Sequence, residues 1–208
     1  MKFKFELFLI VFVIDSTIAA PTKKSTQSNQ VKSEKDAYAW LNKYGYNPCK
    51  NAGVQCSIGF DSIVKEYQER FRLKPTGKLD AATRSHMNRP RCGIEDKAPA
   101  KLSAAPQALR FKWSRSSLTY ALKGYPSELS ESKTSQIIRE AFDAWATHIP
   151  MEITGTCSNC KSDFVVDFER EKHSDNYPFD GSGGTLAHAF FPEDGRIHFD
   201  KDEEWTER

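Results

Sequence analysis

The sequence predicts an α+β protein, with a small three-helix bundle followed by a mixed α/β domain. Residues 36–88 repeat apolar side chains at the three- and four-residue spacing of amphipathic helices. Residues 107–208 instead combine short stretches typical of strands with one helical stretch. Between them, residues 89–106 lack periodicity and contain three prolines, which predicts a linker.

Residues 1–20 predict a secretory signal peptide. Lys2 and Lys4 form a basic start, 7–14 is an unbroken apolar run, and small residues precede Pro21. Residues 21–35 are rich in Ser, Thr, Gln and Lys, so we expect a disordered lead-in. No other run approaches the ~20 apolar residues that a membrane-spanning helix needs. The sequence therefore predicts a secreted protein without a membrane span.

Three helices are expected in the first region. An apolar stripe over 37–44 defines the first helix, and the i, i+3, i+4, i+7 pattern over 60–71 defines the second. A proline and a glycine then interrupt the pattern. Asp80 fits the N-cap of a third helix that runs through Met87.

The second region predicts one long helix and five strands. Ser130 fits the N-cap of a helix whose apolar face runs from Ile137 to Trp145. The strand candidates are 118–122, 151–154, 163–168, 187–191 and 196–199.

The formal net charge is only +2. Nucleic-acid binding calls for a clustered basic face, so we expect no nucleic-acid partner.

The five cysteines matter because thiols outside the cell tend to pair. Cys49 lies close to Cys56, and Cys157 lies close to Cys160, so we expect two local disulfides with Cys92 left over. Sequence alone does not fix the connectivity. Two alternatives exist for Cys157–Cys160. A redox centre would need a thioredoxin-like context, and a zinc site would need a second close cysteine pair.

His173, Asp175, His188 and His198 form a candidate metal site. His173 and Asp175 are two residues apart, which in an extended loop places both side chains on one side. His188 and His198 lie in the last two strand candidates. Zinc takes four tetrahedral ligands, and a full set of protein ligands is typical of a structural site. The alternative is three unrelated histidines at the surface or in the core.

The segment Asp180-Gly181-Ser182-Gly183-Gly184-Thr185 is a candidate loop for a hard cation. Calcium takes six to eight oxygens, and glycines let the backbone turn its carbonyls inward. Asp200 and Glu203 could complete the shell. The alternative is an ordinary glycine turn beside a solvated acidic run.

Cys92 lies in the segment Arg89-Pro90-Arg91-Cys92-Gly93. The two arginines favour the thiolate, which is the metal-binding form of cysteine. The alternatives are a partner for an intermolecular disulfide or an inert thiol.

These motifs together resemble the matrix metalloproteinase family (matrixins, within the metzincins). Pro90-Arg91-Cys92-Gly93 followed by Asp96 resembles the family's propeptide cysteine switch, in which the thiolate occupies the open position of the catalytic zinc. Residues 36–88 are similar to the family's prodomain, which is related to peptidoglycan-binding bundles. The motifs that resemble its structural zinc and calcium segment are His173-x-Asp175, Phe179-Asp180-Gly181, Leu186-Ala187-His188-Ala189 and His198-Phe199-Asp200 with Glu203 and Trp205.

The resemblance implies specific ligands. Structural zinc would be bound by His173, Asp175, His188 and His198. Calcium would be bound by the side chains of Asp180, Asp200 and Glu203 and the carbonyls of Gly181, Gly183 and Thr185, with Asp163 matching a ligand of a second calcium site. The chain departs from the family pattern in a shorter loop between the last two histidines, in Arg196 where an aspartate is expected, and in its cysteine pairs.

The resemblance also implies a secreted zinc endopeptidase zymogen that cleaves extracellular matrix proteins and is activated by another protease; we expect a monomer. His-Glu-x-x-His, which binds the catalytic zinc of metzincins, occurs nowhere in the sequence. We therefore expect a truncated metzincin-type catalytic domain without catalytic residues, inactive as given. The alternatives are a non-catalytic secreted metal-binding protein, a prodomain-type inhibitor that acts in trans through Cys92, and a glycan-binding module formed by 36–88.

Overall fold

The computed structural model describes residues 18–19, 30–51, 58–97 and 112–207. The chain divides into two compact units. We call Ser25–Pro90 with Ile94–Ala105 the helical unit. We call Met1–Lys24, Arg91–Gly93 and Pro106–Arg208 the sheet unit. Within the described residues, no helix is long and apolar enough to cross a membrane.

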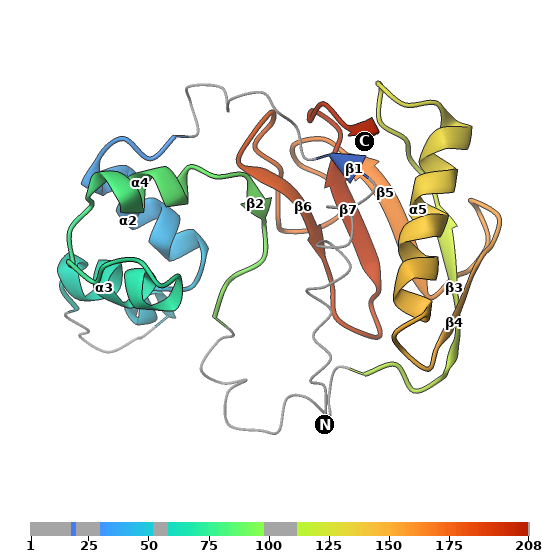
Figure 1. The fold of residues 1–208 in the computed structure, drawn as a ribbon, viewed down its shortest axis with the longest axis horizontal. Coiled ribbons are helices and arrows are strands. Elements are labelled where there is room, and N and C mark those ends of the chain that lie inside the picture. The colour runs from blue at the N-terminus through green and yellow to red at the C-terminus, as the bar shows by residue number, and fades with distance from the viewer. Residues whose placement is uncertain (1–17, 20–29, 52–57, 98–111, 208) are drawn as a thin grey trace. The chain divides into compact units, whose positions relative to one another are not determined.

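The helical unit contains the three predicted helices (Figure 1). They are α2 (Glu34–Lys43), α3 (Phe60–Arg70) and α4 (Ala81–Met87), with a short 3-10 turn, η2 (Pro48–Asn51), after α2. Ser33 caps α2, where its hydroxyl and the Asp36 carboxylate each accept a backbone N–H of the other residue. Asp80 caps α4 as predicted and accepts the Thr83 N–H at 2.8 Å.

Aromatic rings form the core of the helical unit. The Tyr67 side chain is fully buried, and its ring centroid lies 5.2 Å from that of Trp40 and 5.3 Å from that of Tyr46. The Phe71 ring lies 4.9 Å away and the His86 ring 5.7 Å away. His86 thus belongs to a helix-packing cluster, where Tyr67 Oη lies 2.5 Å from its Nδ1.

Gln68 ties the loop after α3 to the rest of the helical unit. Its side chain is fully buried, and its amide nitrogen donates to Thr76 Oγ1, the Lys78 carbonyl and Thr83 Oγ1 at 2.8–3.0 Å. Its amide oxygen accepts the Gly77 N–H at 2.8 Å. One side chain therefore satisfies buried polar groups of both the loop and α4.

We expect Gln68→Ala to destabilise the helical unit by roughly 3 kcal/mol, because the buried partners lose their hydrogen bonds and each costs about 1–3 kcal/mol. Amide hydrogen exchange across 60–87 measures the loss. The control is Gln136→Ala, which removes an exposed amide that donates only to Glu140 in the described residues. Equal exchange rates in the two variants would contradict this role for Gln68.

The sheet unit contains one six-stranded sheet in the order β2-β6-β7-β5-β3-β4. The strands are β2 (Arg91–Cys92), β3 (Ser117–Leu122), β4 (Glu152–Gly155), β5 (Phe164–Glu169), β6 (Thr185–Ala189) and β7 (Arg196–Asp200). The pairing of β6 with β7 is antiparallel, and the other four pairings are parallel. The five predicted strands are present with shifted ends.

The helix α5 (Glu131–Ala146) lies along the sheet in Figure 1, and Ser130 caps it as predicted. Its apolar face packs on the sheet, where the Phe142 ring stacks on Tyr120 with centroids 4.5 Å apart. The buried core of the unit also includes Ile137, Ile138, Leu118, Phe164, Val166, Phe168, Ile197, Phe199 and Trp205.

Two short pairings were not predicted. β2 lies in the segment for which the sequence predicted only a linker, and it extends the sheet at β6. A two-residue strand is too short to show a period, so its pairing partner determines it. The second pairing joins β1 (Ile18–Ala19) to β8 (Thr206–Glu207). β1 lies within residues 1–20, for which a signal peptide was predicted, and that signal peptide stays a prediction.

Candidate metal centre

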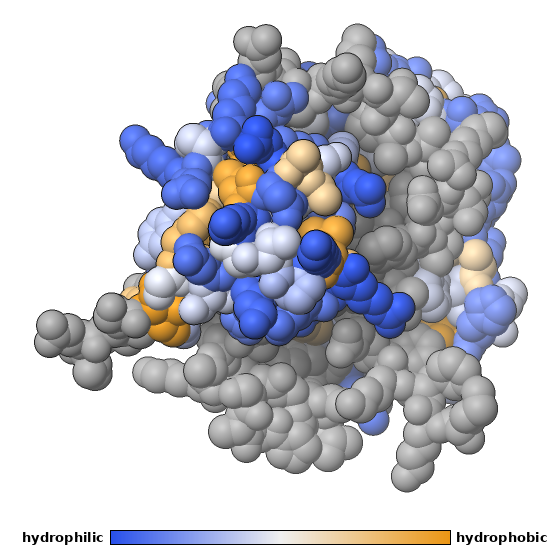
Figure 2. All heavy atoms as spheres, turned by 60° about the vertical axis from the view of Figure 1, so that its left-hand side comes forward, coloured by the Kyte–Doolittle hydropathy of each residue, from blue (hydrophilic) through white to orange (hydrophobic). Residues whose placement is uncertain are grey.

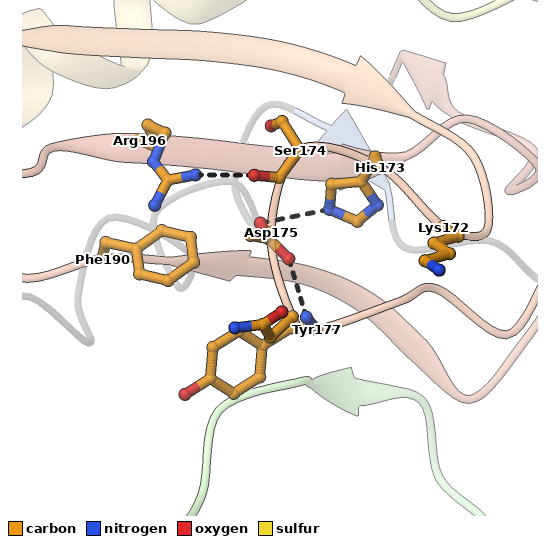
Figure 3. Close-up of a pocket in the computed structure, with 8 residues that line it drawn as sticks. Lys172, His173, Ser174, Asp175, Tyr177, Phe190 and Arg196 are labelled. Carbon is orange, nitrogen blue, oxygen red and sulfur yellow. Dashed lines mark hydrogen bonds and ion pairs between the residues drawn. The ribbon is translucent and has the colours of Figure 1, made fainter.

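Two neighbouring strands and one loop bring four potential metal ligands together. His188 in β6 pairs directly with His198 in β7, so both side chains extend from the same face of the sheet. His173 and Asp175 come from the loop between β5 and β6 (Figure 3). The four ligand atoms all lie within 4.8 Å of one another. The sequence-predicted zinc ligands therefore converge on one point.

The spacing of these atoms fits a tetrahedral ion. Asp175 Oδ2 lies 2.8 Å from His198 Nδ1, 3.0 Å from His188 Nε2 and 3.3 Å from His173 Nε2. His188 Nε2 lies 3.4 Å from His173 Nε2 and 3.2 Å from His198 Nδ1. Ligands at zinc's bond lengths of ~2.0–2.1 Å are separated by about 3.3 Å along a tetrahedron edge.

Burial prepares these groups for a cation. It lowers the pKa of His188 to about 4, although Asp175 acts to raise it, and it also lowers the pKa of His198. Burial alone would raise the pKa of Asp175, but the Tyr177 N–H and the His188 side chain reverse this, and the pKa lies below its usual value. Neutral imidazoles beside an ionised carboxylate are a donor set that zinc prefers.

Aromatic side chains enclose the centre. Phe179 stacks on His173 and on His188 with centroids 4.8 Å apart in each case. Phe190 lies edge-on to His188 at 5.6 Å. On the outer side is a cavity of about 490 Å³ (Figure 3), lined by Lys172, His173, Ser174, Asp175, Asn176, Tyr177, Phe190 and Arg196. The four ligand side chains are at most 4 % exposed.

A second, acidic centre lies at the glycine loop. Asp200 and Glu203 are only 0 % and 1 % exposed, and within the described residues Asp200 Oδ2 and Glu203 Oε2 have no hydrogen-bond partner. Burial, together with Asp180, raises the pKa of Asp200 to about 7. Burial likewise raises the pKa of Glu203 to about 7, with Asp200 and Asp180 contributing. Buried carboxylates are costly unless a positive charge compensates them, so these residues fit a cation.

The loop backbone wraps around these carboxylates. Gly183 donates its N–H to Glu203 Oε1 at 2.6 Å, and Thr185 donates its N–H to Asp180 Oδ1 at 2.9 Å. Gly181 donates its N–H to Asp200. Gly184, which lies in the predicted loop but not among its predicted ligands, has φ +78°, a conformation that strains other residues, and a Cβ there would lie 2.9 Å from Asp180 Oδ2. All six predicted calcium residues thus belong to one loop and its buried acidic partners.

Asp163 lies elsewhere and has partners of its own. Its Oδ2 accepts the Thr119 N–H at 2.8 Å and the Thr119 hydroxyl at 3.1 Å. Its Oδ1 is paired with the Arg115 guanidinium. Arg196 is likewise paired with a carboxylate, since it donates to both Asp194 oxygens at 2.7 and 2.8 Å.

Cys92 lies on β2, in register with Ala187 on β6. It retains a thiol, whereas Cys157 and Cys160 form a disulfide. Cys49 is also disulfide-bonded, and Cys56 lies outside the described residues.

Comparisons with known proteins agree with this site. The family model described as matrixin matches residues 112–208, and the putative peptidoglycan binding domain matches residues 35–87. The chain is 32% identical to matrilysin of Rattus norvegicus over 204 residues, which cover 97% of the chain and 73% of that protein. The chain belongs to the matrix metalloproteinase family.

Other matrix metalloproteinases match over smaller shares of their length. Matrix metalloproteinase-C of Caenorhabditis elegans is 38% identical over 184 residues, 84% of this chain and 31% of that protein. Matrix metalloproteinase-20 of Homo sapiens is 34% identical over 207 residues, 96% of this chain and 42% of that protein. The chain thus spans less than half the length of these two relatives. The family is one of metalloendopeptidases that generally bind zinc and calcium.

Proposed function

We propose that this chain is part of a secreted zinc metalloendopeptidase zymogen that cleaves extracellular matrix proteins. The observation that carries the proposal is the convergence of His173, Asp175, His188 and His198 within 4.8 Å. Family membership supports the enzyme class. The site residues present here would bind a structural ion, because four protein ligands leave no open position for a substrate.

The structural zinc, when bound, supplies a cross-link between secondary-structure elements. His173 and Asp175 would anchor the loop between β5 and β6 to the β6–β7 pair through His188 and His198. The adjacent glycine loop would bind calcium through Asp180, Asp200 and Glu203, with carbonyls of Gly181, Gly183 and Thr185. Both ions would thereby fix the same loop.

Asp163, the predicted ligand of a second calcium site, already has a cationic partner. We assign the compensating positive charge there to Arg115, which pairs with the carboxylate, while Thr119 provides two further donors. Arg196, which stands where the family has an aspartate, is neutralised by Asp194.

Cys92 is the proposed inhibitory ligand of the catalytic zinc. Its thiolate would keep the zymogen latent until an activating protease removes the prodomain. The helix that binds the catalytic zinc is encoded by His-Glu-x-x-His, which these 208 residues do not contain. Reading the transcript beyond the Arg208 codon tests the enzyme proposal. We expect codons for His-Glu-x-x-His within a few dozen codons.

We expect the purified 208-residue chain to show no chelator-sensitive cleavage of a fluorogenic peptide. The second candidate function, inhibition in trans, is favoured by the retained Cys92 thiol on a sheet edge. Titrating the chain against an active matrix metalloproteinase separates the two. Inhibition that disappears in Cys92→Ser but persists in a Ser158→Ala control supports the inhibitor. Robust cleavage by the chain would overturn the expectation.

A further inference from the structure

Within the described ranges of the chain, two residues other than glycine have a positive φ. Arg72 has φ 56° and Glu171 has φ 35°. This left-handed conformation is unfavourable for any residue with a Cβ. Arg72 is the first residue after the C-cap of α3, where a left-handed residue commonly ends a helix. Glu171 follows the strand β5 and ends no helix, so its conformation calls for another explanation.

The carbonyl of Glu171 holds the loop that contains two of the predicted zinc ligands. It accepts the Phe179 N–H at 2.9 Å. It also lies 2.9 Å from His173 Nδ1. A carbonyl has two lone pairs and no proton, so it can accept both bonds, and the His173 ring has to be the donor. Nδ1 then carries the proton, which leaves the lone pair of Nε2 for a metal ion.

His173 depends on this contact more than the other two imidazoles of the centre do. Those two extend from the paired strands β6 and β7, which fix the directions of their side chains. His173 instead lies in the loop between β5 and β6, outside any strand. Its ring is oriented by the Glu171 carbonyl and by Phe179, which stacks on it with centroids 4.8 Å apart. In this orientation its Nε2 lies 3.4 Å from His188 Nε2.

We infer that Glu171 is a positioning residue of the zinc centre and that it acts through its backbone. Its side chain is exposed, so the contacts that matter are those of its carbonyl. The inference rests on the structural zinc proposed above. Without the ion, relaxation of Glu171 to a negative φ turns the carbonyl away and frees the His173 ring. Zinc binding has to maintain the uncommon conformation, so zinc affinity should follow the ease with which residue 171 becomes left-handed.

The experiment measures the zinc dissociation constant of the full 208-residue chain by competition with a chromophoric chelator. Glycine adopts a positive φ readily but makes the free loop more flexible, so we expect Glu171→Gly to bind zinc about threefold more tightly. Glu171→Val should bind zinc about tenfold more weakly, because a β-branched residue resists a positive φ. Glu171→Gln and Glu171→Ala remove the carboxylate without easing the backbone, and their affinities should stay within about twofold of the unmodified chain.

The matched control is Arg72→Gly, which eases the same backbone conformation away from the zinc loop. Arg72 is exposed and belongs to the helical unit, a largely hydrophilic face of which is shown in Figure 2. This variant should bind zinc as the unmodified chain does. Circular dichroism verifies that each variant is folded.

Nitrogen NMR of the imidazoles separates positioning from general stability. In the zinc-loaded unmodified chain, His173 Nδ1 should carry the proton. In Glu171→Val the His173 signals should shift, while those of His188 stay in place. Shifts of equal size at both histidines would contradict a role directed at His173.

Three further results would overturn the inference. Equal zinc affinity in Glu171→Gly, Glu171→Ala and Glu171→Val would do so and leave the zinc centre itself intact. A loss in Glu171→Gln as large as in Glu171→Val would assign the effect to the carboxylate. An unmodified chain that holds no zinc would overturn the proposed centre together with this inference.

Discussion

Replacing His188 with alanine is expected to remove zinc from the protein and to unfold the sheet unit. His188 is fully buried, and its Nε2 lies within 3.4 Å of the ligand atoms of His173, Asp175 and His198. Loss of one ligand leaves a buried carboxylate without its cation. Structural zinc contributes ~10–16 kcal/mol to small zinc-folded peptides, and even a fraction of this equals the ~5–15 kcal/mol stability of a whole domain.

Elemental analysis and thermal unfolding measure this effect. The unmodified chain should hold one tightly bound zinc ion per molecule, and a strong chelator should lower its unfolding temperature to that of His188→Ala. The matched control is His148→Ala, which removes an exposed imidazole after the end of α5. Full zinc occupancy in His188→Ala, or loss of zinc in the control, would refute the assignment of the site.

Without calcium, the sheet unit is expected to lose stability as pH rises from about 4 through about 7. Burial raises the pKa of both Asp200 and Glu203 to about 7, so the folded protein binds more protons than the unfolded chain in that window. Stability falls with rising pH wherever the folded state holds the extra protons. Above pH 7 both carboxylates are charged and buried, at a cost on the order of a few kcal/mol. Calcium binds this charged form and should restore the stability.

The test compares the unfolding free energy of the unmodified chain with that of Asp200→Asn/Glu203→Gln. Both are measured at pH 5 and pH 8, with and without calcium, so the difference isolates these two carboxyl groups. Every other titratable group is common to both proteins, so the difference between the proteins reports the two carboxyls. The amide variant should gain nothing from calcium. Asp143→Asn/Glu140→Gln on the exposed face of α5 serves as the control. The expectation is contradicted if, without calcium, the difference in stability between the unmodified chain and the amide variant does not change with pH.

The sequence predicted most elements because their periods are long enough to read. The helices at 60–71 and 131–146 show several turns of apolar spacing, and Asp80 and Ser130 mark helix starts through their capping chemistry. The strand β2 could not be predicted, since two residues carry no period and only the β6 edge selects them. Strand order likewise depends on pairings between distant segments.

The residues of the candidate site could be selected from the sequence, but their surroundings could not. Histidines and aspartates at short intervals indicate zinc chemistry, yet nothing in their spacing reveals that Phe179 stacks on two of the imidazoles. The burial of Asp200 and Glu203 follows from packing beneath the glycine loop. The Arg115 partner of Asp163 lies 48 residues away in the chain, beyond the reach of any local pattern.

Main-chain hydrogen bonds fasten the segment around Cys92 to the sheet. Arg91 and Gly93 donate their N–H groups to the Gly184 and Ala187 carbonyls at 2.8 Å each, and these bonds are independent of side-chain identity. A methyl group on Gly93 would come within 2.6 Å of the Thr185 side chain, so a larger residue here requires Thr185 to shift. Because these two main-chain bonds do not involve the thiol, oxidising or alkylating Cys92 does not remove them.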